Sequence, residues 1–327
     1  MQVLKFNPIF KTLVWGGEKI APFKGVETGQ HNIGESWELS GVAGNESMVA
    51  EGPYAGRSIA ELVKEFKGEL VGKHVYEKTG NEFPLLIKFI DACKDLSIQV
   101  HPNDELAAAR HGTNGKTEMW YVVAAEPGAA LYSGLSQAIT PAEYEARVAD
   151  GTIVEVLARH QVHPGDVFFL PSGRIHAICS GCFIAEIQQT SDITYRIFDY
   201  NRPGLDGKPR QLHTELAKDA IDYKVYADYR TEYTPLQDEE VELVSCPYFA
   251  TSLLDLTLPY AKDLSEMDSF VVAMCLSGSG TLEVDGTEVP LRQGETLLIP
   301  ASADDLCLVP GACMKVLLSS IPAPGRA

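Results

Sequence analysis

The sequence is poor in basic residues. It has 27 lysines and arginines against 45 aspartates and glutamates, which gives a formal net charge of −18 over 327 residues. A chain this acidic repels nucleic-acid phosphates and anionic lipids. We therefore expect neither nucleic acid nor a membrane surface as a partner, and an anionic substrate would need a local cluster of basic side chains.

Long apolar runs and a disulfide framework are also missing. No apolar stretch is long enough to span a bilayer, and the first residues lack the pattern of a signal peptide. The seven cysteines are odd in number and do not have framework spacing, which is typical of a reducing compartment. We therefore expect a cytoplasmic protein, whose oligomeric state the sequence does not indicate.

Short strand-like runs bounded by turn residues make up most of the chain. The clearest runs are 84–92, 96–100, 118–124, 167–170, 183–188, 193–198, 251–258, 270–276, 281–284, 296–299 and 306–309. Helices are few, and capping residues mark where each begins. The expected caps are Ser58, Asn103, Thr140 and Thr214, with Gly112 and Gly151 as stops. This pattern predicts a mainly β protein with a few short helices.

A turn-and-strand unit occurs twice. Gly165-x5-Pro171 is followed five residues later by His176, and Gly294-x5-Pro300 is followed five residues later by Asp305. Ahead of each unit lies a similar apolar run, 119–123 and 269–273. The repeat predicts two related β-barrels of the jelly-roll kind, of which only the first keeps the histidine.

Four residues in three segments have the chemistry of a metal site. Gln99 and His101 are two apart in a predicted strand and so share a face. Glu118 begins another strand, and His176 follows the first copy of the repeat. An amide, two imidazoles and a carboxylate suit a divalent metal such as zinc, with one position open for substrate. Because an amide is a weak ligand, a hydrogen bond inside the barrel is the alternative role for Gln99.

Two other motifs are weaker candidates for a metal site. His160 and His163 lie just before a turn, with no acid or cysteine nearby to complete a ligand set. Cys179 and Cys182 flank a Ser-Gly pair that suits a two-residue hairpin. We interpret these cysteines as reduced cross-strand neighbours.

The metal motif carries a family resemblance. Gly165-x5-Pro171-x-Gly173-x2-His176 is similar to the second half of the cupin signature. The segments 96–102, 115–121 and 171–177 together resemble the type I mannose-6-phosphate isomerases, and the modest length resembles the short bacterial form. The resemblance covers 84–202 well and the C-terminal part loosely. It implies an N-terminal metal-binding cupin domain with helical additions (1–235) and a C-terminal degenerate cupin domain without metal (236–327).

The resemblance also implies an activity. Such an enzyme is a zinc-dependent aldose–ketose isomerase that interconverts mannose 6-phosphate and fructose 6-phosphate through a cis-enediol, with one zinc per chain. Residue by residue, the family's zinc ligands match Gln99, His101, Glu118 and His176. Its active-site arginine matches Arg196, and an acid considered for proton transfer matches Glu186. Its pocket lysines match Lys88 and Lys116.

Physical chemistry agrees with these roles. Moving a proton between C1 and C2 builds negative charge on oxygen, which a cation and a guanidinium both stabilise. The base is Glu186 or Lys116, and the sequence does not choose between them. For Lys88 and Lys116 an exposed surface position is the alternative. Ser97, beside the metal motif, is a candidate phosphate donor.

The phosphate site departs from the long forms of the family. Those forms have Gly-Leu-Thr-Pro-Lys after the arginine region, where residues 197–202 here read Ile-Phe-Asp-Tyr-Asn-Arg. Phosphate recognition must therefore differ, and Arg202 is the residue that the sequence suggests. Two rival functions remain open: another metal-dependent cupin enzyme, such as an iron oxygenase or a related sugar isomerase, and a sugar-binding cupin without catalysis.

Overall fold

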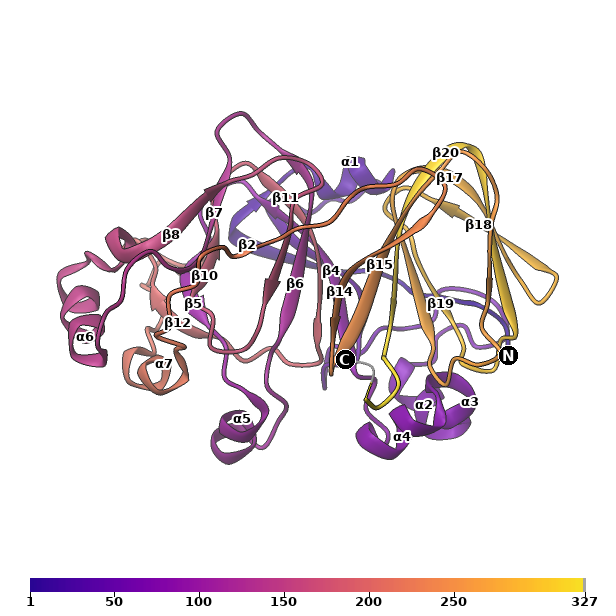
Figure 1. The fold of residues 1–327 in the computed structure, drawn as a ribbon, viewed down its shortest axis with the longest axis horizontal. Helices are drawn as coiled ribbons and strands as arrows, with labels where there is room; N and C mark the ends of the chain where they lie inside the picture. The colour runs from indigo at the N-terminus through magenta and orange to yellow at the C-terminus, as the bar shows by residue number, and fades with distance from the viewer. Residues whose placement is uncertain (326–327) are drawn as a thin grey trace.

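The computed structural model describes residues 1–325 and is mainly β, as the sequence predicts. Its strands form three antiparallel sheets, and the helices are short (Figure 1). Pairing among residues 1–325 closes none of these sheets into a barrel. No helix in this part of the chain is long and apolar enough to cross a membrane.

Two sheets of the N-terminal half enclose the predicted site. The seven-stranded sheet has the order β13 (Arg230–Thr231), β9 (Val167–Leu170), β6 (Glu118–Ala125), β11 (Cys182–Gln189), β4 (Leu85–Ala92), β2 (Ile9–Gly17), β3 (Ile33–Ser40). The five-stranded sheet has the order β12 (Tyr195–Phe198), β5 (Ile98–Val100), β10 (His176–Ile178), β7 (Ala130–Leu135), β8 (Leu157–Gln161).

The C-terminal half is built on an eight-stranded sheet. Its order is β1 (Leu4–Lys5), β19 (Thr296–Ile299), β17 (Val271–Val284), β20 (Asp305–Ser320), β15 (Phe249–Leu256), β14 (Glu240–Cys246), with β16 (Tyr260–Asp263) on β20 and β18 (Thr287–Arg292) on β17. The first strand of the chain thus belongs to the last sheet, because Leu4 pairs with Leu298. In Figure 1 the N-terminus lies beside this sheet.

Capping residues set most helix ends as predicted. Helix α2 (Ile59–Phe66) begins with the Ser58 capping box, α5 (Asp104–His111) is capped by Asn103, and α6 (Pro141–Asp150) begins with the Thr140 capping box. The prediction for Thr214 is wrong by one residue: it is the first residue of α7 (Thr214–Ala220), and no side chain caps that helix. The remaining helical segments are α1 (Ile20–Lys24), α3 (Gly68–Val71), α4 (Lys73–Thr79) and a 3-10 turn (Ile153–Val156).

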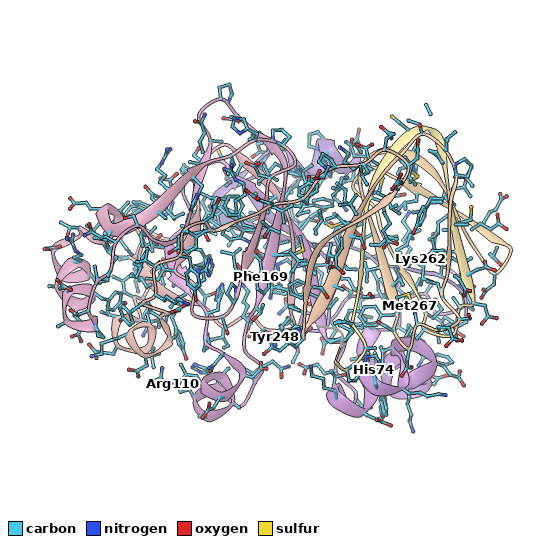
Figure 2. All side chains as sticks on the ribbon, viewed as in Figure 1. His74, Arg110, Phe169, Tyr248, Lys262 and Met267 are labelled. Atoms are coloured by element: carbon cyan, nitrogen blue, oxygen red, sulfur yellow. The ribbon has the colours of Figure 1, made fainter. Side chains whose placement is uncertain are left out.

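The two halves pack against each other through an apolar core. Its members come from both halves, and the rings of Phe83 and Phe270 meet at a centroid distance of 4.8 Å. A polar contact adds to this interface: Tyr248, labelled in Figure 2, donates from the turn after β14 to Asp104 at the start of α5 (2.8 Å). Asp104 also accepts from the Gly115 N–H (2.8 Å), just before the strand that begins with Glu118.

Two expectations about strands are wrong. The runs 270–276 and 281–284 form one strand, β17, because bulges near Gly278 and Gly280 let the chain stay paired with β20. The Ser-Gly turn after Cys179 joins β10 in one sheet to β11 in the other. Cys179 and Cys182 are therefore not cross-strand neighbours in a hairpin, although both are buried free thiols.

Candidate active site

Three of the predicted metal ligands converge in the interior. His101 directly follows β5, Glu118 begins β6 and His176 begins β10, so the two N-terminal sheets both contribute. One ligand atom from each side chain lies within 4.8 Å of the other two. The Nε2 atom of His176 is 3.3 Å from Glu118 Oε1, and the Nε2 atom of His101 is 3.5 Å from Glu118 Oε2. All three residues are at most 2% exposed.

Backbone carbonyls orient both imidazole rings. His101 Nδ1 lies 2.9 Å from the Ile193 carbonyl, and His176 Nδ1 lies 2.8 Å from the Arg174 carbonyl. A proton on each Nδ1 leaves the Nε2 lone pair directed at Glu118, the arrangement of metal-binding histidines.

Four ligand atoms of this triad are buried and form no hydrogen bond among residues 1–325, although the Lys116 ammonium group lies 3.2 Å from one of them, Glu118 Oε2. They are the Nε2 atoms of His101 and His176 and both carboxylate oxygens of Glu118. Buried polar atoms almost always have hydrogen-bond partners. A divalent cation would satisfy all four atoms at once, so the triad fits a metal.

Strand pairing places Gln99 and Arg196 beside this triad. In the five-stranded sheet His176 pairs with Gln99, and Gln99 pairs with Arg196 on the next strand. Directly paired residues share a face of a sheet. The side chains of His176, Gln99 and Arg196 therefore form one row across the interior face.

The facing sheet carries a second polar row. Glu186 on β11 pairs with Lys88 on one side and Trp120 on the other. Lys88 Nζ lies 2.9 Å from Glu186 Oε1, and the Trp120 indole N–H donates to Glu186 Oε2 (2.6 Å). Lys116 Nζ lies 3.2 Å from Glu118 Oε2. Lys88 and Lys116 are buried, so the alternative of exposed surface lysines is wrong.

A cavity of about 170 Å³ lies between the two rows. Six sequence-predicted residues line it, namely Lys88, Ser97, Gln99, Lys116, Glu186 and Arg196. The His101–Glu118–His176 triad adjoins this cavity through its neighbours, since Gln99 pairs with His176 and Lys116 contacts Glu118.

Comparisons with known proteins agree with this geometry. The family model for the catalytic domain of type I phosphomannose isomerases matches residues 3–127, and the model for the mannose-6-phosphate isomerase cupin domain matches 239–316. Mannose-6-phosphate isomerase ManA of Bacillus subtilis is 33% identical, covering 91% of this chain and 92% of that protein. Mannose-6-phosphate isomerase of Streptococcus mutans is also 33% identical, covering 88% and 89%. The crystal structure of mannose 6-phosphate isomerase from Bacillus subtilis superposes with a TM-score of 0.88 at 31% identity, covering 98% and 99%. This chain belongs to the type I phosphomannose isomerase family.

Burial sets the protonation of the triad in this family member. It lowers the pKa of His176 to about 4 and, together with the charge of Lys116, holds the pKa of His101 well below its usual range. Both imidazoles are therefore neutral near pH 7, as metal ligands must be. Burial and the nearby Glu186 raise the pKa of Glu118 to about 7.

Glu186 is held in its ionised form. Burial favours the neutral acid, but Lys88, Lys116 and the Trp120 N–H outweigh burial and lower the pKa of Glu186 below its usual value. Conversely, Glu186 and Glu35 outweigh the burial of Lys88 and raise its pKa. The two side chains therefore form a buried ion pair.

Trp120 and Arg210 line the isomerase cavity but are absent from the sequence prediction. Trp120 binds Glu186, and its position two residues after Glu118 on one strand could have indicated the shared face. Arg210 lines the cavity, whereas Arg202, suggested by the sequence, does not. Both arginines donate to Asp199 (2.6–3.1 Å), a loop contact that sequence spacing does not show.

Proposed function

We propose that the chain interconverts D-mannose 6-phosphate and D-fructose 6-phosphate through a cis-enediol intermediate. The observation that supports this most strongly is the buried triad, whose four ligand atoms form no hydrogen bond, beside a cavity lined by arginines, lysines and glutamates. Family membership supports the same activity, because the relatives named above are mannose-6-phosphate isomerases.

The proposed cofactor is one zinc ion per chain. His101, Glu118 and His176 would hold it, with the Gln99 amide as a fourth ligand on the same face as His176. Nitrogen and oxygen donors in this combination suit zinc. When bound, such a cation polarises the substrate's carbonyl and hydroxyl oxygens and stabilises negative charge on them.

Proton transfer is assigned to the cavity wall opposite the row of Gln99 and Arg196. Glu186 is ionised and is not part of the triad, so it can accept a proton from carbon. Lys116 lines the same cavity and is the alternative acid or base, although its ammonium group contacts Glu118. Lys88 fixes Glu186 through their ion pair and contributes positive charge for an anionic substrate.

Arg196 is proposed to stabilise the negative charge of the enediol. Its Nη1 donates to the Gln211 carbonyl (3.0 Å), while its Nε is buried without a partner among the described residues. A guanidinium fixed in this way needs little reorganisation when charge develops on a substrate oxygen. Ser97, which also lines the cavity, is retained as a proposed substrate contact.

The same proposal covers the architecture. We assign residues 1–235, apart from strand β1 in the C-terminal sheet, to a metal-binding cupin domain with helical additions, and the segment 236–327 to a second, degenerate cupin domain without metal. A jelly-roll is a double sheet and does not need to close into a hydrogen-bonded barrel. The odd cysteine count and the absence of framework spacing in the sequence support a cytoplasmic location.

A coupled assay tests the activity. Purified protein is supplied with mannose 6-phosphate, fructose 6-phosphate is detected by a coupling enzyme, and the rate is measured before and after chelation. We expect ketose formation that chelation abolishes and zinc restores. Oxygen consumption with bound iron and no ketose would instead identify an oxygenase. Sugar-phosphate binding without turnover would identify a non-catalytic protein.

A further inference from the structure

Positive charge is unevenly neutralised along the cavity. Of the four basic side chains that line it, Lys88 is paired with Glu186 and Lys116 with Glu118. Arg196, by contrast, has no carboxylate within 4.0 Å among residues 1–325. The uncompensated charge therefore lies at the Arg196 end, in a protein whose net charge is −18.

A second guanidinium is held at this end by a buried carboxylate. Arg210 donates its Nε and Nη2 groups to Asp199, both at 2.6 Å. Its Nη1 group forms no hydrogen bond within the described part of the chain, and the side chain lines the cavity. Asp199 is 4% exposed and also accepts from Arg202, so two cations share one anion.

The two cavity arginines lie close enough to influence each other. Burial and the neighbouring Arg210 lower the pKa of Arg196. Together with Arg202, the cluster has three guanidinium groups and one carboxylate. An arrangement with this excess charge and a free Nη1 edge is suited to an anion with several oxygens, such as phosphate.

We propose that Arg210 binds the phosphate group of the substrate and that Asp199 orients Arg210 for this contact. The inference rests on the proposed function, because the triad defines where the reacting carbons lie. Arg196 is two strands from His176, on the edge strand β12, which is a separation of about 10 Å. A six-carbon sugar can extend from the triad past Arg196 towards this edge, with its terminal phosphate at Arg210.

Arg202 provides a matched control. It donates to the same Asp199 carboxylate but does not line the cavity. Replacing Arg202 or Arg210 removes one ion pair with Asp199 from the loop. Only Arg210→Gln also removes a positive charge from the cavity. An effect due to loop structure would appear in both variants, and a phosphate contact would appear in only one.

The experiment measures the KM for mannose 6-phosphate and the Kd for inorganic phosphate in wild type, Arg210→Gln and Arg202→Gln, with zinc content and melting temperature recorded. We expect Arg210→Gln to raise both constants about 10- to 100-fold, the usual effect of losing a hydrogen bond to a charged group. Arg202→Gln should change them less than about threefold. Unchanged constants in Arg210→Gln, or equal changes in both variants, would overturn the inference.

Two further measurements cover the remaining outcomes. If Arg210→Gln does not fold, phenylglyoxal labelling of wild type with peptide mass mapping should show that phosphate protects Arg210 but not Arg202; absence of this selective protection overturns the inference. Phosphate binding needs no turnover. If wild type forms no ketose but Arg210→Gln still weakens phosphate binding, only the proposed function is contradicted. If wild type is active but its phosphate affinity does not depend on Arg210, only this inference is contradicted.

Discussion

The N-terminal and C-terminal halves contain the same turn-and-strand unit, but the interior beside it is polar in the first half and apolar in the second. Strand β9 follows Gly165 and pairs with β6, so that Leu170 lies opposite Glu118. Strand β19 follows Gly294 and pairs with β17 in the same way, with Ile299 opposite Val271. Val271 therefore occupies the position that Glu118 holds in the first half. This register differs by three residues from the match of 119–123 with 269–273 expected from sequence character.

The interior around Val271 is apolar. Val271 belongs to a buried cluster with Leu297, Ile299 and Leu306, whereas Glu118 lies among imidazoles and lysines. Asp305, which matches His176 by spacing, is exposed at the start of β20. The comparison shows that the shared turn-and-strand unit is compatible with either a polar metal site or an apolar core. A metal site requires the carboxylate and both imidazoles in the same half.

The largest expected effect comes from removing the proton-transfer groups, which the apolar half lacks. Glu186→Gln and Lys116→Met should be compared by steady-state kinetics. General acid–base groups contribute about 10²–10⁴-fold, so the variant that lacks the base should lose that much kcat. Retained zinc and an unchanged melting temperature are the controls. Near-normal kcat in both variants would show that neither residue transfers the proton.

Placing a carboxylate in the second half should break its core without creating a metal site. Val271→Glu buries a charge that has no partner, and we expect it to reduce the free energy of unfolding by about 3–5 kcal/mol. Denaturant unfolding measures the loss, with Val271→Ala as the control for lost packing. A variant as stable as wild type, or one that binds a second metal ion, would show that the halves differ less than the register indicates.

Arg196→Ala should reduce kcat by about 10²–10³-fold, because fixed donors at developing oxyanions typically contribute this much. Zinc content should stay at the wild-type level, since Arg196 pairs with Gln99 but is not in the triad. Metal analysis and kinetics on the same sample check both parts. A loss of zinc in proportion to activity would assign Arg196 to metal-site structure.

The smallest expected effect is a pH dependence of stability in the metal-free protein. The pKa of Glu118 is raised from 4.5 to about 7, so ionisation is penalised in the folded state. Stability should therefore fall as pH rises from about 4.5 to 7. Val271 can have no such dependence.

Glu118→Gln isolates this contribution. Free energies of unfolding of metal-free wild type and Glu118→Gln should be compared at pH 5 and pH 8, and the gap in favour of the variant should be larger at pH 8. A gap that does not change with pH would mean that Glu118 titrates normally.

Local chemistry explains what could be predicted from the sequence. The triad followed from strand alternation and the unit ending at His176, and the helix ends followed from caps such as Ser58 and Thr140. Long-range contacts explain what was missed. The pairing of Leu4 with Leu298 joins opposite ends of the chain. Arg210 lies on a loop and is held at the cavity by its hydrogen bonds to Asp199. Neither contact can be predicted from a periodic pattern in the sequence.

Zinc titration of metal-free protein, with isomerase activity measured at each addition, tests the central claim most directly. If only the half with Glu118, His101 and His176 binds a catalytic metal, activity should rise linearly with zinc and stop rising at one equivalent per chain. Activity that needs two equivalents, or that is complete without metal, would contradict the account.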